Sequence, residues 1–250
     1  MSAFIDPICV LSAGSLRHAF PAIIAAFGLG TNIPVTLSLG PAGVLRERIE
    51  AGEYFDLYAS ANMAHPRRLN DLNLAADAVC FARNRLCVLA RSDLELTTDN
   101  FIDVIANPAV KIGTSTPGDD PSGDYAFEVF DRIEAAHPGL GKLLKSRALQ
   151  LVGGRNSPLT PPGKGGGWLI TEGHADLFLS YHSNARLLRD DPALSIVALP
   201  TAFSPAVEYG LATRLGANSE TQQLAKFVLS KPGQIILAMH GFEPVRSIPA

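Results

Sequence analysis

The chain has 250 residues, enough for one large domain or for two of about 100 to 150 residues each. With 47% hydrophobic residues it can bury a sizeable core, and its net charge of −3 gives no general attraction to nucleic acid or to an anionic membrane. No stretch approaches the ~18 consecutive apolar residues of a membrane-spanning helix, so no membrane insertion is expected.

Short apolar stretches alternate with helical patterns along the whole chain, which predicts an α/β protein with largely parallel sheets. The predicted strands are Ile8–Ala13, Val35–Leu39, Leu57–Ala59, Leu86–Ala90, Lys111–Gly113, Leu149–Val152, Leu177–Ser180, Ile196–Leu199 and Tyr209–Ala212. The predicted helices are Leu16–Phe27, Val44–Ala51, Ala64–Asn70, Tyr125–Ala136, Gly167–Glu172, Asn184–Arg189, Thr221–Leu229 and Gly233–Met239. Ligands of such sheets bind beyond the carboxyl ends of the strands, where strands connect to helices.

Four strand-to-helix connections are rich in Gly, Ser, Pro or Ala: loop 1 (12–16, SAGSL), loop 2 (40–45, GPAGVL), loop 3 (119–125, DDPSGDY) and loop 4 (161–168, PPGKGGGW). Small residues allow an anion to approach the unpaired N–H groups at the start of a helix. Tight turns favour the same residues, so each loop is either a plain turn or part of an anion site.

Loop 1 joins a predicted strand directly to a helical pattern, and Ser15 is expected to cap that helix. Pro21 would remove a hydrogen bond inside the helix, so the helix is expected either to kink or to begin late. Arg17 then falls in the first helical turn, where its side chain is either solvated or folded over a bound anion.

Motifs of catalysis are absent. The sequence has no GxSxG, no P-loop, no GxGxxG between a strand and a helix, and no HExxH among its six histidines. Cys9, Cys80 and Cys87 show no CxxC spacing and are expected to be small buried side chains. The protein is therefore expected to bind rather than to catalyse, with no cofactor and no metal coordinated directly by the protein.

Several segments resemble the periplasmic molybdate-binding proteins of ABC importers. These are VLSAGSLRHAFPAIIAAF, VTLSLGPAGVLRERIEAGEYFDLYASAN, NRLCVLAR, IGTSTPGDDPSGDYAFEVF, GHADLFLSYHSNA and AKFVLSKPGQIILAMHGFEP, in the order and spacing of that family. The resemblance covers almost the whole chain. It implies a type II periplasmic-binding fold, in which each of two lobes has a mixed, mostly parallel sheet flanked by helices. The implied lobes are 1–83 with 205–250, and 84–204, joined by two crossing strands.

The resemblance also implies which residues hold the ligand by hydrogen bonds. They are Ser15, Ala42, Gly43, Ser122, Gly163 and Tyr181, with Arg17, Ser60 and Lys164 as further candidates. Ala42 stands where the family has a serine, Ser122 where it has an alanine, and Arg17 where it has a small polar residue. Molybdate, tungstate and sulfate carry no proton at neutral pH and require donors only, whereas Asp124 is either a helix-dipole partner or an acceptor for a protonated ligand such as phosphate.

The function implied is the capture of a small oxyanion, molybdate or tungstate first, by a monomer that delivers it to the membrane subunits of an ABC importer. The alternative is a cytoplasmic sensor or storage module of the same fold, binding sulfate, phosphate or a small organic anion. MSAFIDPICV lacks the features of a signal peptide. The protein is therefore expected to be periplasmic if a signal peptide was removed or omitted, and cytoplasmic if Met1 is the true start.

Overall fold

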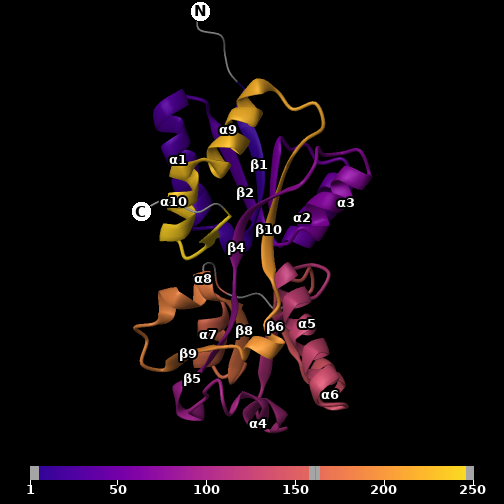
Figure 1. Cartoon of the computed structure of the whole chain (residues 1–250), viewed down its shortest axis with the longest axis vertical. Helices are drawn as coiled ribbons and strands as arrows, with labels where there is room; N and C mark the ends of the chain where they lie inside the picture. Colours follow the sequence, from indigo (N-terminus) through magenta and orange to yellow (C-terminus); the bar gives the residue numbers. More distant parts are fainter. Residues whose placement is uncertain (1–5, 158–160, 162–163, 246–250) are drawn as a thin grey trace, which may run out of the picture. The chain divides into compact units, whose positions relative to one another are not determined.

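A computed structural model describes residues 6–157, 161 and 164–245, and its chain divides into two units (Figure 1). Unit 1 comprises Met1–Asn84 and Glu208–Ala250, and unit 2 comprises Arg85–Val207. The sequence placed the two crossings at 83/84 and 204/205. In the structure Asn84 belongs to unit 1, because strand β4 (Val79–Asn84) extends to this residue. Residues 205–207 belong to unit 2.

Unit 1 contains a mixed sheet with helices on both sides. Its strands are β1 (Ile8–Ala13), β2 (Val35–Gly40), β3 (Leu57–Ser60), β4 (Val79–Asn84), β10 (Val207–Thr213, which begins one residue before the crossing) and β11 (Glu243–Pro244). Its helices are η1 (Gly14–Leu16), α1 (Ala19–Thr31), α2 (Ala42–Glu50), α3 (Ala64–Asp71), α9 (Ser219–Leu229) and α10 (Lys231–Met239). Helices α1, α9 and α10 cover one face, and α2 and α3 cover the other (Figure 1).

The strand order in unit 1 is β11-β4-β10-β3-β1-β2. β1 is parallel to both β2 and β3, whereas β3 is antiparallel to β10. The carboxyl ends of β1, β2 and β3 therefore share one edge of the sheet, and the connections that follow them start from that edge.

Unit 2 has a second sheet of similar construction. Its strands are β5 (Leu86–Arg91), β6 (Ile112–Ser115), β7 (Leu149–Val152), β8 (Leu177–Tyr181) and β9 (Leu194–Ala198). Its helices are η2 (Ser92–Leu94), α4 (Phe101–Ala106), α5 (Pro121–Ala136), α6 (Leu140–Arg147), α7 (Gly166–Thr171), α8 (His182–Ala185), η3 (Arg186–Leu188) and η4 (Thr201–Phe203).

The two sheets repeat one topology without a repeat in the sequence. The order in unit 2 is β7-β6-β8-β5-β9, and the order β2-β1-β3-β10-β4 in unit 1 corresponds to it strand by strand. In both orders the second strand, β1 or β6, is parallel to both of its neighbours, and the fourth strand, β10 or β5, is antiparallel to the third. The prediction of an α/β fold with mixed, mostly parallel sheets is confirmed in each unit.

Each unit has its own apolar core. Phe81 of β4 packs edge-on against Phe20 of α1, with ring centroids 6.0 Å apart, and against Tyr209 of β10, at 6.2 Å. In unit 2, Leu89, Leu169 and Phe178 belong to a buried cluster between α7 and the sheet. Burial of such side chains is the main source of stability in each unit.

The sequence predicted several elements accurately and missed others. β1 and β7 have the predicted bounds, whereas β4, α4 and α6 were not predicted. The first helix begins late, at Ala19, so Pro21 occupies its third position, where a backbone N–H has no partner inside the helix. Ser15 lies before it in η1, and the expectation that Ser15 caps this helix is wrong: the N-cap is His18, without a side-chain hydrogen bond.

The contact between α5 and α6 provides a test of the packing in unit 2. A Cβ on Gly141 would collide with the carbonyl oxygen of Phe130 and would lie 2.6 Å from the Cβ of Glu134. Gly141→Ala is therefore expected to lower the free energy of unfolding by about 1–3 kcal/mol, because α6 must move away from α5. Urea denaturation measures the change.

Gly28→Ala is the matched control, because a Cβ at Gly28 in α1 meets no atom within 4 Å. It is expected to raise the free energy of unfolding by about 0.5–1 kcal/mol through helix propensity. Equal effects of the two substitutions would contradict the close helix contact at Gly141.

Candidate functional site

Loops 1 and 2 lie side by side at the carboxyl edge of the unit 1 sheet. The parallel register pairs Ala13, the last residue of β1, with Gly40, the last residue of β2. A Cβ on Gly14 would lie 3.8 Å from the carbonyl oxygen of Gly40. The structure therefore brings Ser15 and the pair Ala42–Gly43 to the same edge, as their places after neighbouring parallel strands predict.

Ser15 is a half-buried residue in the short η1 helix. Its Oγ accepts a hydrogen bond from the hydroxyl of Tyr209, at 3.0 Å. Ser12, at the end of β1, is fully buried, and its Oγ has no hydrogen-bond partner among the described residues. Loop 1 thus contains two hydroxyls, one buried and one that accepts a hydrogen bond from Tyr209, whose hydroxyl nothing in the local sequence marks as a partner of loop 1.

Arg17 is exposed and folds back onto its own loop. Its Nε donates to the carbonyl oxygen of Gly14 at 2.8 Å, and the Arg17 N–H donates to the same oxygen at 3.3 Å. The side chain is thus held beside loop 1, and no other hydrogen bond or ion pair of Arg17 occurs within residues 6–157, 161 and 164–245.

Loop 2 leaves the start of α2 open. The N-cap is Pro41, which provides no side-chain hydrogen bond, and the first helical bond runs from the N–H of Leu45 to the carbonyl oxygen of Pro41. The N–H groups of Ala42 and Gly43 have no hydrogen-bond partner in the described part of the chain. Such a helix start favours an anion.

Tyr58 holds the first residue of α2 in place. Its side chain is fully buried, and its hydroxyl donates to the carbonyl oxygen of Ala42 at 2.6 Å. Burial raises the pKa of Tyr58 above its usual value, so the hydroxyl keeps its proton and remains a donor. Tyr58 was predicted only as part of a strand, because nothing local marks its hydroxyl as a partner of residue 42.

Loop 3, unlike loop 2, supplies carboxylates at the start of its helix. Asp120 is the N-cap of α5 and accepts a hydrogen bond from the N–H of Ser122 at 3.0 Å. Asp124 accepts from the N–H of Gly118 at 2.7 Å, and burial raises the pKa of Asp124. The backbone donor of Ser122 is thus used within the loop, and Ser122 retains only its hydroxyl as a possible ligand contact.

The segment after β7 packs tightly against loop 3. Gly153 has φ +78°, and a Cβ there would lie 2.5 Å from Oδ2 of Asp120. Arg155 pairs with Asp119 at 3.2 Å. Glycine at 153 is therefore required both by its backbone conformation and by the closeness of Asp120.

The remaining candidates lie in different environments. Tyr181 ends β8, is buried, and packs edge-on against Tyr125 with ring centroids 6.4 Å apart. Ser60 ends β3, and its hydroxyl donates to Oδ1 of Asn62 at 3.2 Å, which accepts in turn from the N–H of His65 in α3. Lys164 is exposed, and Gly163 lies outside the described residues.

Among the described residues, no group of three or more His, Cys, Asp or Glu side chains is arranged to hold a metal ion. None of the described helices combines the length and the apolar character needed to cross a membrane.

The comparisons with known proteins agree with this architecture. The periplasmic molybdate-binding protein of Azotobacter vinelandii superposes with a TM-score of 0.73 at 18% identity, over 96% of this chain and 100% of that one. The sulfate-binding protein SubI of Mycobacterium tuberculosis superposes with a TM-score of 0.75 at 17% identity, over 96% of this chain and 87% of that one. The fold is that of the type II periplasmic-binding proteins.

The sequence itself shows the family. Residues 8–243 match the family described as bacterial extracellular solute-binding protein, and the chain belongs to that family. An uncharacterised protein of Pasteurella multocida is 38% identical over 205 residues, which cover 81% of this chain and 85% of that protein.

The electrostatics beside loop 2 give a pH-dependent prediction. Burial, and then the positive charge of Arg46, lower the pKa of His65 to about 4. In the unfolded chain the ring of His65 takes up a proton near pH 6.5, whereas in the folded protein it stays neutral until about pH 4. The free energy of unfolding is therefore unaffected by His65 above about pH 6.5 and falls as the pH is lowered from there toward 4. The free energy of unfolding lost over this whole pH range is about 3 kcal/mol.

His65→Gln is expected to reduce the fall in stability between about pH 6.5 and pH 4 by a comparable amount, because it removes the titrating ring. Denaturant unfolding at a series of pH values measures it. The same acid dependence in both proteins would show that His65 is not its source.

Proposed function

We propose that this protein captures a small oxyanion, molybdate or tungstate first, and delivers it in the periplasm to the membrane subunits of an ABC importer. The observation that carries the proposal is the pairing of loops 1 and 2. The Ser15 hydroxyl and the N–H groups of Ala42 and Gly43 lie at one edge of the sheet, next to an uncapped helix start.

Donors of this kind suit a fully deprotonated oxyanion. Molybdate, tungstate and sulfate present only acceptor oxygens, and hydroxyl and backbone N–H groups satisfy such oxygens without a counter-charge. The first turn of α2 has no acidic residue. The partial positive charge at the start of α2 therefore acts on the anion without competition from a carboxylate in that turn.

Two of the structural neighbours support an oxyanion as the ligand. They are the molybdate-binding and sulfate-binding proteins described above. The family consists of solute-binding proteins, which supports binding without catalysis. We infer that the protein acts as a monomer and that its ligand is held by hydrogen bonds.

Loop 3 favours a second candidate, an oxyanion that carries its own O–H. Asp120 and Asp124 place acceptors at the start of α5. Because burial raises the pKa of Asp124, its carboxyl group shares a proton with a ligand O–H more readily. Phosphate, or a small organic anion with a hydroxyl, would suit these acceptors. A cytoplasmic sensor or storage role would be served by the same chemistry.

The ligand class is tested by thermal unfolding of the purified protein with molybdate, tungstate, sulfate or phosphate. Stabilisation is expected to grow with ligand concentration, by about 2.7 kcal/mol at one hundred times Kd. Ser15→Ala is expected to weaken binding of the preferred oxyanion about 10- to 100-fold, because a hydrogen bond to a charged ligand is lost.

Ser146→Ala is the control, since Ser146 is an exposed residue of α6 whose hydroxyl donates to the carbonyl oxygen of Leu143 at 2.8 Å. It is expected to bind like the unmodified protein. If none of the four oxyanions shifted the unfolding temperature at millimolar concentration, the proposed ligand class would be wrong.

A further inference from the structure

Three residues that are far apart in the sequence form a hydrogen-bonded series at loop 1. Nδ2 of Asn84 donates to the hydroxyl of Tyr209 at 3.4 Å, and that hydroxyl donates to Oγ of Ser15 at 3.0 Å. Asn84 and Tyr209 are buried, whereas Ser15 is half-buried. The series therefore begins inside unit 1 and ends at a residue that solvent and ligand can reach.

The ring of Tyr209 is fixed by packing. It is fully buried and lies edge-on between Phe81, with centroids 6.2 Å apart, and Phe242, at 5.2 Å. The next residue, Gly210, has no room for a side chain, because a Cβ there would lie 2.6 Å from Pro66. The position of the Tyr209 hydroxyl is thus set by the core before any ligand binds.

The strands that carry this series are the two that connect unit 1 to the rest of the chain. β4 ends at Asn84, the last residue of unit 1 before the first crossing, and Tyr209 lies just after the return at Glu208. β4 and β10 are neighbours in the sheet, and Arg83 pairs with Glu208 at 3.3 Å.

The direction of these bonds determines what Ser15 offers to a ligand. A serine hydroxyl has one proton and two lone pairs. Because Oγ of Ser15 already accepts from Tyr209, its proton is directed elsewhere, and the accessible side of the residue presents a donor. A hydroxyl oriented before binding loses less rotational freedom when the ligand arrives.

We infer that Tyr209, held by Asn84, is a positioning residue that orients Ser15 as a donor and so selects ligand oxygens that carry no proton. This inference rests on the proposed function, because it assumes that Ser15 contacts the bound oxyanion. Tyr209 acts through Ser15 and need not touch the ligand.

The test is a double-mutant cycle of Tyr209→Phe and Ser15→Ala, with Kd measured calorimetrically for molybdate, sulfate and phosphate. Tyr209→Phe is expected to weaken the binding of sulfate or molybdate about three- to tenfold. In the Ser15→Ala background the same substitution is expected to have no further effect, because residues that act through one interaction are not additive.

A second readout separates positioning from general destabilisation. Without the Tyr209 donor, the Ser15 hydroxyl can rotate and accept from a P–OH group. The preference for sulfate over phosphate is therefore expected to narrow in Tyr209→Phe. Asn84→Ala is expected to weaken the binding of sulfate or molybdate less than Tyr209→Phe does. This effect, too, is expected only when Ser15 is present.

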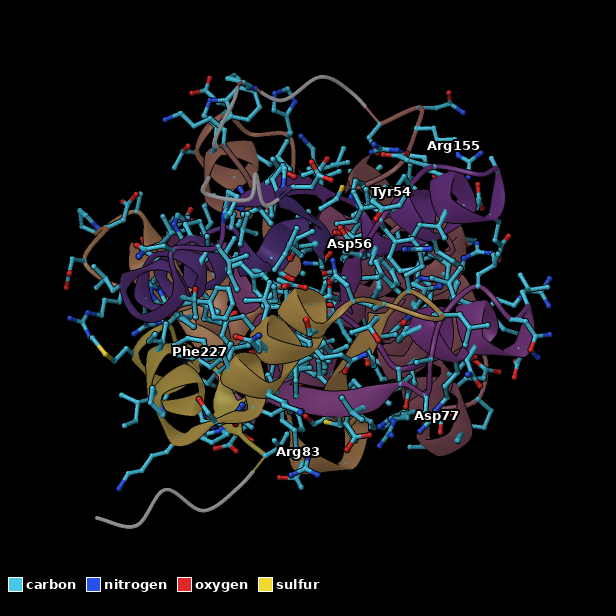
Figure 2. The ribbon with its side chains drawn as sticks, turned by 90° about the horizontal axis from the view of Figure 1, so that it is seen from above. Tyr54, Asp56, Asp77, Arg83, Arg155 and Phe227 are labelled. Carbon is cyan, nitrogen blue, oxygen red and sulfur yellow. The ribbon has the colours of Figure 1, made fainter. Side chains whose placement is uncertain are left out.

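Tyr54→Phe is the matched control. The Tyr54 hydroxyl donates to Oδ1 of Asp56 at 2.7 Å in the segment that leads into β3, and the two side chains lie close together in Figure 2. Removing this exposed hydroxyl is expected to leave all Kd values unchanged. Denaturant unfolding of each variant checks that it is folded under the conditions of the titration.

The outcomes distinguish the two proposals. Oxyanion binding by the unmodified protein, with equal losses from Tyr209→Phe in the presence and absence of Ser15, would overturn the positioning role and leave the proposed function standing. If the unmodified protein bound none of molybdate, sulfate and phosphate, and tungstate did not bind either, the proposed function would be overturned, and the role of Tyr209 with it.

Discussion

The parallel pairing of β1 with β2 and β3 is the constraint on which the candidate site depends. Pairing of Ala13 with Gly40, and of Ser12 with Ala59, brings three strand ends to one edge. Every connection that follows must leave from that edge, so loops 1 and 2 are neighbours although about 25 residues separate them. β1 and β3 are buried on both faces, so a shift of one residue in this register would exchange the side chains that pack against the two helical layers. The arrangement is therefore strongly specified.

The two units use one topology with different chemistry at the starts of their helices. In unit 1, α2 begins with unpaired N–H groups and no acidic side chain in its first turn. In unit 2, α5 begins with Asp120 as its cap and Asp124 in its first turn. A helix dipole favours an anion in both places, but at α5 the chain supplies the negative charge itself. Unit 1 is therefore the better donor to a deprotonated ligand, and unit 2 provides acceptors.

Two tyrosines of unit 1 connect the apolar core with the polar edge of the sheet. Tyr58 and Tyr209 are both fully buried, yet each hydroxyl reaches a residue in a site loop, Ala42 or Ser15. The energy that fixes them comes from burial of their rings, not from contact with a ligand. Core packing thereby places two hydroxyls against polar groups at the edge of the sheet.

Alternating apolar and amphipathic segments determined the fold class, the bounds of β1 and β7, and the small-residue loops that carry Ser15 and Ala42, because these follow from local periodicity and turn chemistry. Local pattern did not reveal β4, whose alternation is weak, or the late start of α1 after an η1 turn. Only the tertiary structure showed that the Tyr209 hydroxyl donates to Ser15 and that the Tyr58 hydroxyl donates to Ala42, because neither contact follows from the local sequence. The first contact joins residues 194 positions apart and the second joins residues 16 positions apart, so each depends on how the strands are placed in the sheet.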